Sequence, residues 1–165
     1  MLPSPLHPAI VHFPIVLMFL LPLAVVGALW AIRRGTPVVR AWMFPLVTAG
    51  VLVASAWAAV ETGETDEERA EDVVGEQVLE AHEAAAERFL ALSVGVLIVT
   101  AAGLAGGSIG RVARGLGGAA ALALILAGYQ VGHSGGRIVY GDAGTRGLAG
   151  AVTGPGEGED TRSDD

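Results

Sequence analysis

The amino-acid sequence predicts an all-α protein, a four-helix transmembrane bundle with both chain termini on the outer side of the membrane. Apolar residues make up 52% of the chain, and its mean hydropathy is +0.56. Charged residues make up only 16%, against roughly a quarter in soluble domains. Four long apolar runs carry no charge, and each is close to the ~20 residues that a helix needs to cross a bilayer. We expect one domain over residues 1–150 and a disordered acidic tail over 151–165.

The first helix is expected over residues 8–33, because no charge occurs from Met1 to Ile32. Pro8 suits the first turn of a helix, where its missing N–H is not needed. Pro14 leaves the carbonyl of Ile10 without its helical partner, so we expect a bend beside His12.

The second and third helices are expected over residues 41–61 and 75–107. A short basic segment, 33–37, ends the first helix, so the first two helices form a tight hairpin. An acidic stretch from Glu61 to Glu87 follows, in which Val78, Leu79 and His82 recur at helical spacing. We interpret this stretch as an amphipathic extension that leads into the third span.

The fourth helix is expected over residues 114–133, because the segment from Gly115 to Gly136 is again uncharged. Arg111 and Arg114 are expected in the short loop before it. Arginines also occupy the loop between the first two helices, and positively charged loops favour the cytoplasmic side. We therefore expect a bacterial cytoplasmic (inner) membrane protein whose acidic loop and termini face outward.

All four histidines are predicted near this outer side: His7 and His12 begin the first helix, His82 begins the third and His133 ends the fourth. The chain has no cysteine, which excludes thiolate metal sites and covalently attached c-type haem. Two imidazoles on facing helices are a common protein contribution to a b-type haem. We expect His12, His82 and His133 at similar depth, with His7 farther toward water and turned roughly 140° from His12.

Several alternatives stay open at this point. A divalent metal ion could be bound by His12, His82 and His133 with Glu61 or Glu83, and one of these carboxylates could instead orient the His82 ring. The glycines at positions 128, 132 and 136 fit either a haem edge or close helix packing. Each histidine could also be a simple headgroup or packing residue. Three tryptophans are expected as interfacial anchors: Trp30, Trp42 and Trp57.

Two sequence motifs resemble a known family. The segment 7–14 reads HPAIVHFP and the segment 132–141 reads GHSGGRIVYG, and with the histidine of the third helix they resemble the bacterial membrane family called domain of unknown function 2231. The resemblance covers residues from about Leu6 to Gly150 and implies four helices with no established activity. Some relatives are joined to cytochrome c or Rieske domains, which implies a redox setting. Cytochrome-linked relatives often have a histidine at the position of Tyr140.

The leading functional hypothesis is electron transfer by a b-type haem protein near the outer membrane face, with a partner protein or a quinone in the lipid bilayer. A divalent metal-binding or transport protein and a cofactor-free structural subunit are the alternatives. No phosphate-binding loop, nucleophile–base pair or nucleic-acid patch stands out, so we expect no independent enzyme and no nucleic-acid partner. The sequence leaves open whether the chain forms a homo-oligomer.

Overall fold

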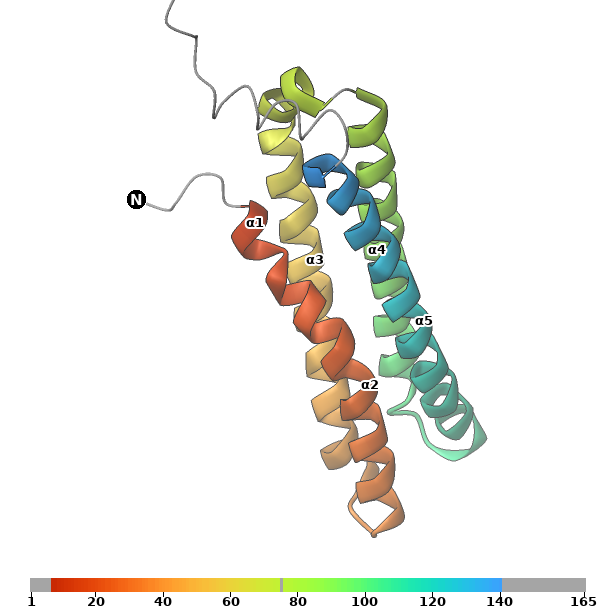
Figure 1. Ribbon diagram of the computed structural model, residues 1–165. Helices are drawn as coiled ribbons and strands as arrows, with labels where there is room; N and C mark the ends of the chain where they lie inside the picture. Colours follow the sequence, from red (N-terminus) through yellow and green to blue (C-terminus); the bar gives the residue numbers. More distant parts are fainter. Residues whose placement is uncertain (1–6, 75, 141–165) are drawn as a thin grey trace, which may run out of the picture.

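The protein is a bundle of long antiparallel helices, seen in a computed structural model that describes residues 7–74 and 76–140 (Figure 1). A single helical turn comes first, and four long helices follow it. The elements are α1 (His7–Ile10), α2 (His12–Arg33), α3 (Val38–Val74), α4 (Glu76–Ala102) and α5 (Gly107–Tyr140). No strand occurs in these described residues, so the predicted all-α class is confirmed.

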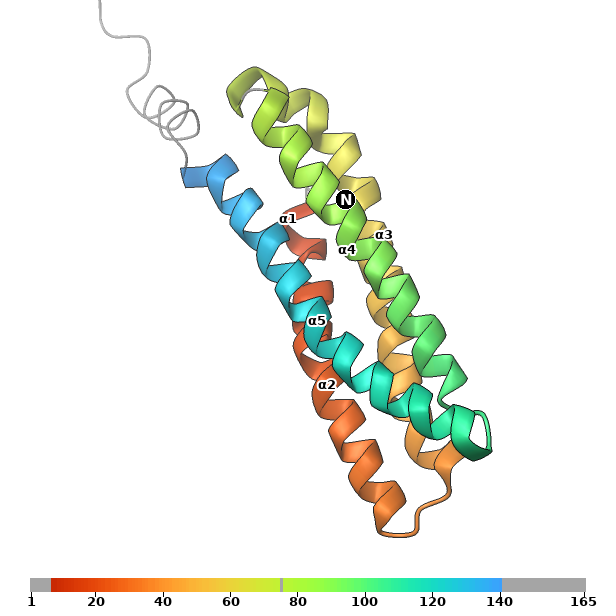
Figure 2. The ribbon, with the colours of Figure 1, turned by 90° about the vertical axis from the view of Figure 1, so that its right-hand side faces the viewer.

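The four long helices form a ring in which each packs against its neighbours in sequence and α5 closes the ring against α2 (Figure 2). Short connections join α2 to α3 and α4 to α5 at one end, which we call the loop end. α1 and the end of α5 lie toward the other end, which we call the histidine end (Figure 1). Four segments are long and apolar enough to cross a membrane: His7–Arg33, Val38–Thr65, Glu76–Ala102 and Gly107–Arg137. The predicted four-helix transmembrane bundle is therefore confirmed. Which end faces outward stays a prediction.

A break separates α1 from α2 where the sequence predicts a bend. Val11 lies between the two helices, and its N–H still donates to the carbonyl of His7 at 3.1 Å. Pro14 has no N–H to donate to Ile10, so the helical hydrogen-bond ladder is interrupted at that point. Val11 itself keeps helical dihedral angles, so the break is a gap in the hydrogen bonding within one apolar segment, His7–Arg33.

Two helices are longer than the apolar runs indicated. The second, expected over 41–61, runs to Val74, and the fourth, expected over 114–133, begins at Gly107 and ends at Tyr140. Arg111 and Arg114 consequently lie in the first turns of α5 and not in a loop. The third, expected over 75–107, ends at Ala102. The apolar run marks the part of a helix inside the membrane, whereas a helix of 37 residues extends about 55 Å, well past the ~30 Å hydrocarbon layer.

The core of the bundle is apolar and is formed by side chains from all four long helices, among them Met18, Leu52, Phe89 and Leu124. Large apolar side chains also cover the outside, as expected for a surface that contacts lipid. Within the helices the backbone N–H and C=O groups are paired with one another, as a protein in lipid requires. The apolar outer surface is therefore the surface expected of a membrane protein.

Trp42 is not an interfacial anchor, in contrast to the prediction. Its side chain is 0% exposed, and its Nε1–H donates to the carbonyl of Thr100 at 2.7 Å. A Cβ atom at Gly103 would overlap the Trp42 ring, so this glycine makes room for it. Trp30 and Trp57 are largely exposed, as anchors would be. Spacing in the sequence could not distinguish the three tryptophans, because each lies near the end of an apolar run.

Candidate functional site

The structure brings two of the four histidines together at the histidine end of the bundle. His7, on α1, and His82, on α4, have ring centres 6.4 Å apart, and their ring planes are nearly perpendicular at 89°. Both rings are partly buried. The pair thus joins residues that are far apart in sequence and lie on two different helices.

The ring of His7 is held by α3. Its Nδ1 atom lies 2.8 Å from the carbonyl oxygen of Ala59 and 3.4 Å from Oγ1 of Thr62. The Thr62 hydroxyl donates its hydrogen to the carbonyl of Ala58 at 2.8 Å, so it can only accept from His7. These contacts fix the direction of the imidazole against the neighbouring helix.

The ring of His82 is held by α5. Its Nδ1 atom lies 3.0 Å from Oγ of Ser134. The hydroxyl of Ser134 donates to the carbonyl of Val131 at 2.9 Å, so its oxygen accepts from the imidazole. Ser134 was not among the predicted site residues, although it lies beside His133 in the segment 132–141.

These partners determine which ring nitrogen carries the hydrogen. For His7 the donor must be Nδ1, because the Ala59 carbonyl oxygen only accepts hydrogen bonds. For His82 the donor is Nδ1 when the Ser134 hydroxyl gives its single hydrogen to the Val131 carbonyl, the contact of 2.9 Å. In the neutral imidazoles the lone pair is then on Nε2 of His7 and Nε2 of His82. Histidines that bind metals usually have this arrangement, with one nitrogen donating to a protein oxygen and the other free to coordinate.

Two glycines allow the rings to lie this close to neighbouring helices. A Cβ atom at Gly63 would be 3.2 Å from Cε1 of His7, and one at Gly135 would be 3.1 Å from Cε1 of His82. Both distances are shorter than ordinary van der Waals contacts of about 3.5–4.0 Å. A glycine on α3 and a glycine on α5 therefore make room for one imidazole each.

The other two histidines do not join the pair. His12 and His133 are exposed on the outside of the bundle, and the His133 ring stacks on Tyr129 with ring centres 6.1 Å apart. The sequence predicted His12, His82 and His133 at similar depth and His7 farther toward water, whereas in the structure His7 is the histidine beside His82. Depth along the helix was not sufficient to identify the inner residues, because the rotation of each helix decides which side chains face inward.

Neither candidate carboxylate contacts a histidine by a hydrogen bond. Glu61 is exposed, Glu83 is half-buried, and the His82 partner is the serine on α5. Within residues 7–74 and 76–140, no group of three or more His, Asp or Glu side chains is arranged to hold a metal ion. The three glycines spaced by four on α5 differ in their surroundings. Gly128 packs tightly against Met18, whereas Gly132 and Gly136 have open space beside them.

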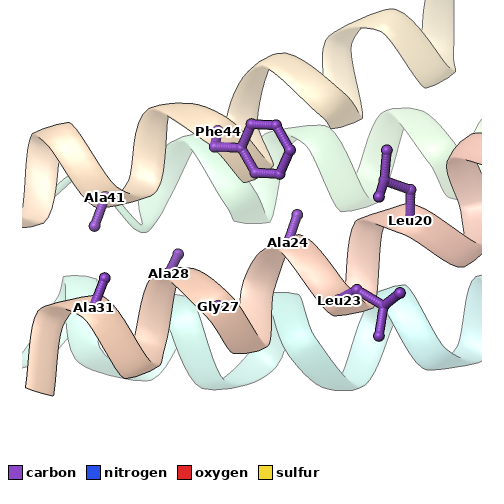
Figure 3. A pocket seen from close by; sticks show the side chains of 8 residues that line it. All are labelled: Leu20, Leu23, Ala24, Gly27, Ala28, Ala31, Ala41 and Phe44. Atoms are coloured by element: carbon purple, nitrogen blue, oxygen red, sulfur yellow. The ribbon is translucent and has the colours of Figure 1, made fainter.

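An apolar groove on the outer surface between α2 and α3 contains none of the candidate residues (Figure 3). Its volume is about 310 Å³, and its lining is Leu20, Leu23, Ala24, Gly27, Ala28, Ala31, Ala41 and Phe44. With no ionisable group in that lining, the groove offers no ligand to an iron or metal ion. The histidine pair is therefore the candidate site.

A comparison with known protein families gives a match over most of the chain. The family model described as "Predicted membrane protein (DUF2231)" matches residues 3–146. No curated protein and no solved structure matches the chain. The matched region includes both histidines of the pair and the residues that hold them.

Proposed function

The chain belongs to the DUF2231 family of predicted membrane proteins, and on that premise we propose that it carries electrons through a b-type haem held between His7 and His82. The observation that supports this most is the pair of half-buried imidazoles, each with Nδ1 bonded to protein oxygen and Nε2 carrying a lone pair. Helix bundles commonly build cofactor sites from side chains on facing helices.

The number of ligands favours haem over a divalent metal ion. The macrocycle supplies four nitrogen atoms to its iron, so two imidazoles complete the protein's share of the coordination. A zinc site needs three or four protein ligands, and the described residues place no third His, Asp or Glu with the pair. The two histidines thus form a complete set for haem iron and an incomplete set for zinc.

The two rings are close enough to belong to one site, because their centres lie 6.4 Å apart although they come from two different helices. His7 and His82 would hold the iron, while Ala59 and Ser134 keep the rings oriented through Nδ1.

When bound, the haem would supply one-electron oxidation and reduction, and the protein would supply position and surroundings. The pair lies at the histidine end, close to where the membrane span ends. A quinone in the bilayer or a partner protein could exchange electrons there. The exposed stack of Tyr129 and His133 lies on the same helix as Ser134 and offers a contact surface to either.

The test is the absorption spectrum and haem content of the full chain, purified in detergent after expression with haem supplied. We expect a Soret band in the parent, loss of the normal spectrum in His7→Ala and His82→Ala, and a nearly unchanged spectrum in His12→Ala and His133→Ala. The last two are matched controls because they remove imidazoles of the same membrane end that lie outside the pair.

The same preparations separate the competing functions. A colourless parent that retains a divalent metal ion would favour the metal-binding alternative, and five colourless, metal-free preparations would favour a structural subunit. Loss of the spectrum in His12→Ala or His133→Ala with retention in His7→Ala would contradict the assignment of the pair.

A further inference from the structure

A second groove lies at the loop end of the bundle, far from the histidine pair. It runs along the outer surface between the last turns of α4 and the first turns of α5, and its volume is about 450 Å³. Its lining is apolar except for one serine: Ile98, Val99, Ala102, Ser108, Ile109, Val112, Ala113 and Leu116. Because this face of the bundle is directed toward lipid, a hydrocarbon chain is the natural occupant of the apolar part.

Polar groups stand at the edge of this groove. Ser108 is exposed, and Arg111 follows it by three residues, which makes the two neighbours on the surface of α5. Side chains on a helix tilt toward its N-terminus, so the Arg111 guanidinium leans toward the loop end, where the bilayer has its headgroups. The Ser108 hydroxyl thus belongs to the lining of the groove, and the exposed Arg111 lies about one helical turn away from it on α5.

The charge of the loop end indicates the sign of the headgroup. Its charged residues are all arginines: Arg33, Arg34, Arg40, Arg111 and Arg114. Every carboxylate in the described residues lies in the segment 61–87, toward the histidine end. An anionic group is thus attracted to the loop end and meets no nearby carboxylate there.

Two nearby arginines already have other contacts. Arg114 is buried and donates through a guanidinium nitrogen to the carbonyl of Gly103. Arg34 lies over the ring of Trp30, 4.9 Å from its centre. The groove in Figure 3 contains no polar side chain at all. Of these two grooves, the one between α4 and α5 has an exposed hydroxyl in its apolar lining and an exposed guanidinium nearby on the same helix.

We propose that the groove between α4 and α5 binds one anionic phospholipid, with an acyl chain along Ile98, Val112 and Leu116 and the phosphate at Ser108 and Arg111. Arginine suits this role because its planar guanidinium forms two parallel hydrogen bonds with a phosphate. The proposal is independent of the haem site, because the two features lie at opposite ends of the bundle.

Native mass spectrometry of the full chain tests this site by titration with phosphatidylglycerol and, separately, with phosphatidylcholine of the same acyl chains. We expect phosphatidylglycerol to bind at least about fivefold more tightly, as one favourable arginine contact would give. Arg111→Gln should remove this preference. Arg137→Gln, an exposed arginine at the other end of the same helix, should retain it.

A second variant tests the apolar part. Ala102→Phe places a ring in the groove from an exposed position and should weaken the binding of both lipids, while the thermal unfolding temperature in detergent stays near that of the parent. Equal binding of the two lipids by the parent would overturn the proposal. So would an equal loss of preference in Arg111→Gln and Arg137→Gln, or unchanged binding in Ala102→Phe.

Discussion

The imidazole rings of His7 and His82 lie with their centres 6.4 Å apart, although 74 residues separate the two positions in the chain. The contact depends on three features of the fold. The first turn, α1, packs against α3, and the antiparallel ring brings α4 to the same end. Each ring is then hydrogen-bonded at Nδ1, His7 to the Ala59 carbonyl of α3 and His82 to the Ser134 hydroxyl of α5.

Replacing Ser134 by alanine should change the properties of the bound haem. The His82 ring loses its acceptor at Nδ1, so it becomes less basic and less well oriented, and we expect haem binding to weaken about 10- to 100-fold. The reduction potential of the remaining haem should rise, because a weaker imidazole donor stabilises ferric iron less. Redox titration and haem retention measure both effects.

Ser55→Ala is the matched control for this change. Ser55 donates to the carbonyl three residues earlier, as Ser134 does, but it bonds to no imidazole. An unchanged potential and unchanged haem retention in Ser134→Ala would show that the serine does not position His82.

Replacing Gly135 by alanine should disturb the pair by steric contact. The new Cβ would lie 3.1 Å from Cε1 of His82, so the ring must shift away from its position. We expect a clear loss of haem content. Gly132→Ala on the same helix has open space and should keep the haem, with helix stability improved by up to about 1 kcal/mol.

Haem content and thermal unfolding in detergent distinguish the two glycine variants. Equal haem content in Gly135→Ala and Gly132→Ala would mean that the close approach of His82 to α5 has no importance for the site.

The four spans and the placement of the histidines at one end could be predicted from the sequence. Both depend on local features, namely long uncharged runs and the position of each histidine relative to the ends of these runs. The sequence did not predict that His7 is the inner residue of the first motif. That outcome depends on how the turn before Val11 packs against α3, which is a tertiary contact. The sequence also offered Glu61 or Glu83 as a residue that could orient the His82 ring, whereas the hydrogen bond seen in the structure is to Ser134. A short side chain on a closely packed helix can reach a ring that a nearby glutamate does not face.

Replacing Trp42 by phenylalanine should destabilise the loop end of the bundle. The variant loses the Nε1–H bond to the Thr100 carbonyl, which still accepts from the Gly103 N–H at 3.0 Å, so the lost bond should cost about 0.5–1.5 kcal/mol. Trp57→Phe changes an exposed side chain and should have little effect. Thermal unfolding in detergent measures the difference, and equal stability of the two variants would contradict the role assigned to Trp42.

The orientation in the membrane can be tested with single cysteines, because the chain has none of its own. Thr36 lies in the connection between α2 and α3, and Thr65 is exposed near the histidine end of α3. An impermeant thiol reagent should label Thr65→Cys in spheroplasts and reach Thr36→Cys only after the membrane is disrupted. The reverse pattern would mean that the arginine loops face outward.

The most direct test of the haem assignment is electron paramagnetic resonance of the oxidised parent protein, together with its iron and haem content per chain. Two imidazoles complete the coordination of the iron, so we predict one haem per chain and the low-spin ferric signal of bis-histidine ligation. A parent protein that holds no haem under these conditions would contradict the account. So would one that holds haem only as high-spin iron with a single imidazole.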